Sequence, residues 1–237
     1  MRTELAALRS VPAFRRATAL AIAFSGFLAI SFLGVRDLEH TAIEDARSAL
    51  SSGAVAGFVT VVYAAATAGG EVARGGFALA LLGGADRRRA TADRLGAHAV
   101  AGALLGVGAA VMAAVLTFAL MGFGDGPLPG AGDVLARGLG TVAYTALMGV
   151  LGAALGLALR SPAAAVITAL VVLLALDPLF SGFSTEVARW GLGGTAGSLT
   201  GSGDDLPPAW AGGLVLLGYV TALGALATVL TAKRDVP

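Results

Sequence analysis

Six long stretches of this chain contain no Asp, Glu, Lys or Arg, and they constrain the fold more than any other feature. They are residues 17–35, 53–70, 95–121, 138–159, 163–176 and 209–232. A helix needs about 20 apolar residues to cross the hydrocarbon of a bilayer. In all, 57% of the 237 residues are hydrophobic and 13% are charged, against about 25% charged residues in soluble domains. The chain is predicted to be all-α: one polytopic membrane domain, 1–237, with six transmembrane helices.

The segments outside these stretches differ in character. Residues 1–16 contain four arginines and repeat apolar residues at helical spacing, which predicts a short interfacial helix before the first span. A basic start before an apolar run also fits a cleaved signal peptide, but the length of 17–35 and the spans that follow favour an uncleaved helix. Asp177-Pro178 is expected to end the fifth span early. We expect 177–208 to be an external, partly re-entrant segment.

The distribution of basic residues predicts the orientation. With six spans both termini share one side, which would hold twelve of the sixteen Lys and Arg residues: Arg2, Arg9, Arg15, Arg16, Arg74, Arg87, Arg88, Arg89, Arg94, Arg160, Lys233 and Arg234. Basic residues accumulate on the cytoplasmic side of membrane proteins. Both termini and the loop 71–94 are therefore predicted to be cytoplasmic, in the plasma membrane. The dominance of Arg, Ala and Gly indicates a high-GC, bacterial genome.

Several functions are disfavoured by what the chain lacks. It has no cysteine, and His40 and His98 are its only histidines, so no metal or cofactor site is predicted. The only lysine is Lys233, so no Walker A loop precedes it, and any ATP must be bound by another chain. Spans without charges argue against ion-coupled carriers. His98 is interpreted as an interfacial residue rather than a catalytic one. The basic residues sit in loops, so no nucleic-acid partner is expected.

Glycine pairs at a spacing of four recur within the spans. They are Gly53/Gly57, Gly102/Gly106 and Gly152/Gly156. Such pairs allow helices to approach closely. The pattern fits tight packing within one bundle and packing between two protomers equally well.

The segment Glu71–Arg94 is the longest charged interruption of the apolar chain. It places an apolar centre, 77–82, between glycine pairs and follows it with Arg87, Arg88, Arg89 and Arg94. Glu71 at a membrane boundary is costly unless it is paired, and Arg74 at i+3 is the nearest basic residue. A short helix at 77–82 is expected.

This segment resembles the region between the second and third helices of ABC-2-type transporter permeases. In that family a Glu ends the second helix, a basic residue and Gly follow, then a short coupling helix and an Arg-rich stretch; Glu71, Arg74, Gly75, 77–82 and 87–94 match in order. The basic tail and the layout of elements are also similar. The chain departs from the pattern at Gly76, where the family often has Thr.

The resemblance implies the membrane subunit of an ATP-driven exporter, not itself an enzyme. Such a permease pairs with an identical or different second permease protomer and with ATP-binding subunits, and it would export an amphipathic or hydrophobic drug, natural product or lipid-like molecule. The residues implied in coupling to the ATPase are Glu71, Arg74, Gly75, Phe77, Leu79, Leu81 and Leu82. The residues implied in fixing topology or holding membrane lipid are Arg87, Arg88, Arg89 and Arg94.

Two other interpretations follow from the residues alone. The 77–82 helix could rest on anionic lipid without touching a partner. The whole chain could be a non-transporting docking, immunity or assembly protein of the membrane. A membrane-embedded enzyme is disfavoured because the spans carry none of the catalytic groups that such enzymes need.

Overall fold

The computed structural model describes residues 12–34, 43–76, 86–121, 128–203 and 205–233, and these residues are mostly helical with no strand among them. Among these described residues, six helical segments are long and apolar enough to span a membrane. The described elements are α2 (Pro12–Gly34), α3 (Ile43–Ser51), η2 (Ser52–Val55), α4 (Ala56–Ala73), α6 (Arg87–Met121), α7 (Ala131–Leu159), α8 (Pro162–Val171), η3 (Val172–Leu176), α9 (Asp177–Ser181), α10 (Thr185–Trp190), α11 (Leu192–Thr200) and α12 (Ala209–Lys233). The expected all-α architecture is confirmed for this part of the chain. The expected interfacial helix at 1–16 falls mostly, and the helix at 77–82 entirely, outside it.

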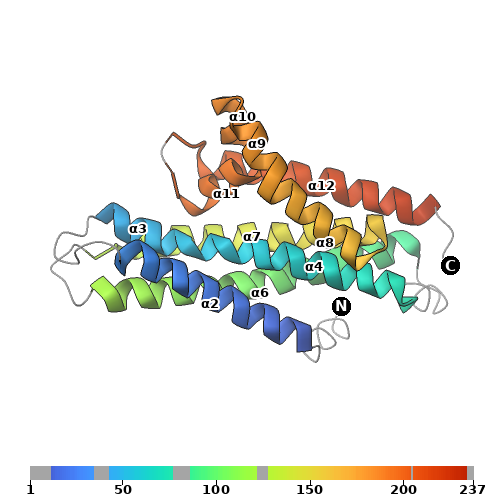
Figure 1. Ribbon diagram of the computed structural model, residues 1–237, viewed down its shortest axis with the longest axis horizontal. Helices are drawn as coiled ribbons and strands as arrows, with labels where there is room; N and C mark the ends of the chain where they lie inside the picture. Colours follow the sequence, from blue (N-terminus) through green and yellow to red (C-terminus); the bar gives the residue numbers. More distant parts are fainter. Residues whose placement is uncertain (1–11, 35–42, 77–85, 122–127, 204, 234–237) are drawn as a thin grey trace.

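Helix α7 is the centre of the bundle and packs against α4, α6 and α12 (Figure 1). Helix α2 lies on the outer side of α4 and α6, and α8 lies along α4. Many of the buried residues that α7 contributes are small, among them Gly149, Gly152 and Ala153. Small cores of this kind let neighbouring backbones come close, which drives helix association where lipid removes the hydrophobic effect.

The glycines of the spaced pairs lie in contacts within this one bundle. A Cβ at Gly102 would lie 2.3 Å from the carbonyl oxygen of Thr145, and one at Gly152 would lie 2.3 Å from the carbonyl oxygen of Val61. Real Cβ atoms do not approach other atoms so closely, so these positions require glycine. The packing of α6 and α4 against α7 therefore accounts for these pairs without a second protomer.

The ends of the helices form two groups at opposite ends of the bundle (Figure 1). The start of α2, the end of α4, the start of α6, the α7–α8 turn and the end of α12 lie together at one end. Here Arg87 Nη1 donates a hydrogen bond to the carbonyl oxygen of Ala232, 3.3 Å away. At the other end Arg137 Nη1 donates to Ser51 Oγ and to the carbonyl of Gly201, which joins α7, α3 and the end of α11.

The fifth span is longer than expected. Pro162 does begin α8, and Ser161 caps it by accepting a hydrogen bond from the backbone N–H of Ala164 at 3.4 Å. The helix does not stop at Asp177, because a π-helical segment, Val172–Leu176, leads directly into α9. The wider π turn accommodates Pro178, which lacks an N–H and would clash within a regular helix. The apolar segment thus reaches 20 residues, Pro162–Ser181.

The segment after α9 packs onto the bundle. Helix α11 lies against α7 and α12, and Thr195 and Thr200 are fully buried there. Part of the expected external segment is therefore integrated into one end of the bundle. Whether it enters a membrane stays a prediction.

Candidate functional site

The charged segment 71–94 begins within α4 and ends within α6. Helix α4 runs through Glu71 to Ala73, and Gly75 then adopts φ +74°, a left-handed conformation that side chains disfavour. The N–H of Gly75 donates to the carbonyl of Val72 at 3.0 Å, which closes the end of the helix. Gly75 thus serves as the expected break after the second span. The arginine run is not loop, because α6 begins at Arg87.

A partly buried ion pair joins the end of α4 to the start of α6. Arg94 Nε donates to Glu71 Oε1 at 3.0 Å, and Nη2 of the same guanidinium also contacts this oxygen. The Arg94 side chain is 4% exposed and that of Glu71 is 34% exposed. Arg94 Nη1 also donates to the carbonyl of Ala90 at 3.2 Å. Two contacts from one guanidinium to one carboxylate, with the arginine buried, hold the two helix ends together.

This pair changes two expectations. Glu71 has a basic partner, as expected, but the partner is Arg94 and not Arg74. Arg74 is exposed and follows the last helical turn of α4 with φ −90° and ψ 7°, so the regular i, i+3 geometry is lost. Arg94, which the sequence pattern groups with lipid-facing arginines, is instead inside the bundle. A guanidinium that is buried against a carboxylate does not reach lipid headgroups.

The ion pair continues into a hydrogen-bonded chain. His98, one turn after Arg94 on α6, approaches the carbonyl oxygen of Arg94 with Nδ1 at 2.9 Å. Its Nε2 lies 3.0 Å from Thr67 Oγ1 on α4. A carbonyl oxygen only accepts, so Nδ1 carries a proton. His98 is 5% exposed, so it is a buried link between α4 and α6 and not the interfacial residue that was expected. The spacing of four from Arg94 was the signal that could have indicated this.

The other arginines of the run lie at the surface of the same end. Arg88 and Arg89 are exposed, and Arg87 is partly buried through its contact with the end of α12. A cation near a helix C-terminus is favourable because the last carbonyl groups carry partial negative charge. Phe77, Leu79, Leu81 and Leu82 lie outside the described residues.

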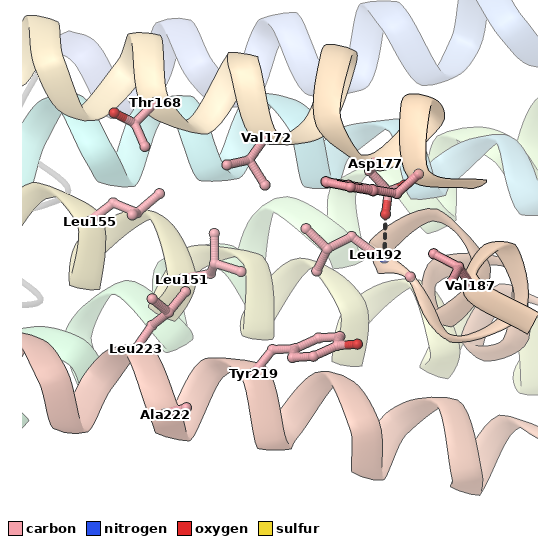
Figure 2. Close-up of a pocket in the computed structure, with 12 residues that line it drawn as sticks. Leu151, Leu155, Thr168, Val172, Asp177, Val187, Leu192, Tyr219, Ala222 and Leu223 are labelled. Carbon is pink, nitrogen blue, oxygen red and sulfur yellow. Dashed lines mark hydrogen bonds between the residues drawn. The ribbon is translucent and has the colours of Figure 1, made fainter. Parts of the chain in front are cut away.

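A large apolar cavity lies towards the other end of the bundle. Its volume is about 620 Å³, and it is bounded by α7, by α8 and its continuation, by α10 and α11, and by α12 (Figure 2). Leu151 and Leu155 of α7 form its floor, while Val172 and Tyr219 face each other from opposite walls. Ligand pockets are typically 300–1,000 Å³, mostly apolar, with a few polar groups.

Asp177 is the charged residue of this cavity wall. Its Oδ1 accepts from the backbone N–H of Leu192 at 2.7 Å (Figure 2). Its Oδ2 accepts from the backbone N–H of Gly193 at 2.9 Å. The carboxylate therefore caps the N-terminus of α11 from the end of the fifth span. A Cβ at Gly191 would lie 2.7 Å from Oδ1, so glycine is needed for this approach. The sequence pattern assigned Asp177 only to the end of a helix and did not reveal the cavity.

The described residues offer no grouping of three or more His, Asp or Glu side chains that could hold a metal ion. No protein-family model and no curated protein matches the chain in a search against each.

Proposed function

We propose that this protein is the membrane permease subunit of an ATP-binding-cassette exporter of the ABC-2 type. The main support for this proposal is the partly buried Glu71–Arg94 pair, which joins the two helix ends that enclose the charged loop. A segment that receives force from a partner must be attached firmly to the helices that it moves. An ion pair with a nearly buried arginine, extended by the contacts of His98, supplies such an attachment between α4 and α6. A loop that only rests on lipid does not need one.

In this proposal ATP is bound and hydrolysed by a separate subunit, since the chain has no Walker lysine. The apolar residues Phe77, Leu79, Leu81 and Leu82 dock on that subunit, and the pair carries the movement into α4 and α6. Arg87, Arg88 and Arg89 fix the loop at the membrane surface, where lipid phosphates favour cations. A second permease protomer, identical or different, completes the transport path.

The proposed orientation places this loop and both termini in the cytoplasm of a bacterial cell. Its support is that the helix ends bearing Arg15, Arg16, Arg74, Arg87 and Arg160 lie at one end of the bundle (Figure 1). Such a concentration of basic residues is typical of the cytoplasmic side. The exported substrate is proposed to be amphipathic or hydrophobic, because the described spans are lined by apolar residues.

Copurification tests the proposal. The tagged protein is expressed in its native cells, extracted in mild detergent, and assayed for a copurifying ATP-binding-cassette subunit and for ATP hydrolysis. The expected result is a complex whose hydrolysis depends on the permease, and whose assembly is lost in Phe77→Asp but kept in Leu128→Asp at the other end of the bundle. Recovery of the protein with lipid alone would contradict the proposal. A complex without any effect on hydrolysis or export would instead identify a docking or assembly protein.

A further inference from the structure

We propose that the cavity between α7, η3, α11 and α12 binds a hydrophobic monocation, with the Asp177 carboxylate as its counter-charge. This deepens the proposed function by giving the charge of the exported substrate. The binding itself requires neither the ATPase nor a second protomer, so it can be tested on this chain alone.

The shape of the cavity suits a molecule with aromatic or branched apolar groups. Among the residues that line it, leucines and valines from α7, η3, α10, α11 and α12 form a continuous apolar surface: Leu151, Leu155, Val172, Val187, Leu192 and Leu223. The volume of about 620 Å³ is in the middle of the range for small-molecule sites. Burying apolar surface against these walls provides non-directional affinity. It does not select for charge.

The charge of the wall selects for a cation. Asp177 is the only acidic or basic side chain among the described residues that line the cavity. The two backbone N–H groups of α11 hold its oxygens, but a helix N-terminus offsets only about half a unit charge. Each carboxylate oxygen also keeps a lone pair. The cavity wall therefore has a net negative charge, which attracts a cation and repels an anion.

Aromatic rings add to the same preference. Tyr219 lies on the wall opposite Asp177 (Figure 2). Its hydroxyl donates a hydrogen bond to the carbonyl of Trp190 at 3.0 Å. This bond fixes the ring in the cavity wall and occupies the proton of the hydroxyl. Phe180 of α9 contributes a second ring. The faces of aromatic rings attract cations, especially ones that are weakly hydrated.

The π-helical segment explains how an aspartate of the fifth span comes to face this cavity. A π turn amounts to one extra residue in the helix, which rotates everything after it by about 100°. Val172–Leu176 is such a segment and ends at the residue before Asp177. Without it the carboxylate would be turned away from its present position against the N-terminus of α11. π turns of this kind occur often at functional sites.

A pair of probes with nearly the same shape and opposite charge tests the proposal. Tetraphenylphosphonium is a hydrophobic monocation, and tetraphenylborate is its anionic counterpart. Binding of each is measured by isothermal titration to the purified protein in nanodiscs of uncharged lipid, with empty nanodiscs as the reference. We expect the protein to bind the cation at least tenfold more tightly than the anion after this subtraction.

Two variants and one control assign the binding to this cavity. Asp177→Asn keeps an oxygen that can cap α11 and removes the charge; it should lower cation affinity about tenfold and leave the anion unchanged or better bound. Ala222→Trp places a large ring in the cavity and should abolish specific cation binding. Asp205→Asn removes an exposed acid outside the cavity and should change neither, while circular dichroism confirms that all three variants are folded.

Three outcomes would overturn the proposal. One is equal affinity of the intact protein for the two probes. Another is cation binding that Asp177→Asn and Ala222→Trp leave unchanged. The third is a phospholipid that native mass spectrometry finds retained in the intact protein and lost in Ala222→Trp, with no cation binding. Cation binding without ATPase assembly would support this site while contradicting the proposed function, so the two failures are distinguishable.

Discussion

The Glu71–Arg94 pair predicts an unequal response to the removal of its two charges. Glu71→Gln leaves the guanidinium of Arg94, 4% exposed, without that carboxylate. Breaking a buried pair in this way costs about 3–5 kcal/mol of stability. Arg94→Met retains most of the packing and leaves the charge of Glu71, which is 34% exposed and partly hydrated. We expect this variant to cost only about 1–2 kcal/mol, because water screens the remaining charge.

The double variant separates the pair from its surroundings. Removing both charges should cost less than Glu71→Gln alone, with an interaction energy of about 2–3 kcal/mol. Unfolding in dodecylmaltoside micelles with increasing dodecylsulfate, followed by circular dichroism, gives the four stabilities. The pair Arg47–Asp133 at the other end, with side chains 41% and 31% exposed, is the control. The double-mutant cycle of this control pair should give an interaction energy of about 0.5 kcal/mol. Additive effects at Glu71 and Arg94, or single costs below about 0.5 kcal/mol, would refute the reasoning.

Three further predictions concern packing, the far end of the bundle, and topology. Gly152→Ala should lower stability by about 1–3 kcal/mol, since its Cβ would meet a backbone carbonyl. Gly218→Ala on α12, where the added Cβ meets nothing, should be neutral or stabilising. The same dodecylsulfate titration compares the two variants. Arg137→Met should speed hydrogen exchange in α3 and α11, which it joins to α7, and slower or unchanged exchange there would contradict the assigned contacts. A single cysteine at Leu128 should react with an impermeant maleimide in intact cells, and one at Asp86 only after permeabilisation; the reverse pattern would reverse the orientation.

The sequence was sufficient for the architecture because lipid imposes a simple rule on it. A backbone that crosses hydrocarbon must satisfy its own hydrogen bonds, so long uncharged stretches become helices. The described part of the chain accordingly contains six helices that are long and apolar enough to span a membrane. Pro162 at the first turn of its helix was predictable for an equally local reason, because its fixed φ and missing N–H suit that position.

The fifth helix shows where local rules fail. A proline usually ends a helix, and Asp177-Pro178 was expected to do so. In the structure a π turn instead accommodates the proline, and the helix continues. The aspartate accepts hydrogen bonds from two backbone N–H groups of α11, fifteen and sixteen residues later. Such long-range compensation cannot be seen in a window of neighbouring residues. The cavity that Asp177 borders was missed for the same reason.

The partner of Glu71 shows the same limit. Sequence distance favoured Arg74, but the helix ends between these two residues and removes the i, i+3 contact. The arginine that does pair with Glu71 is 23 residues away on another helix. A charge cluster in the sequence gives no sign of which member will be buried. Four of the residues assigned to ATPase docking lie outside the described part of the chain, and their role stays a prediction.

We propose that the loop between α4 and α6 contacts an ATP-binding subunit, and site-specific crosslinking is the decisive experiment for this contact. The natural chain has no cysteine, so single cysteines can be introduced at Phe77 and, as the control, at Leu128 without other changes. We expect Phe77→Cys to crosslink to an ATP-binding-cassette subunit in membranes, and we expect this crosslink to change ATP hydrolysis. Leu128→Cys should not crosslink to that subunit. No crosslink from Phe77→Cys in membranes where both proteins are present, or an equal crosslink from the control, would contradict it.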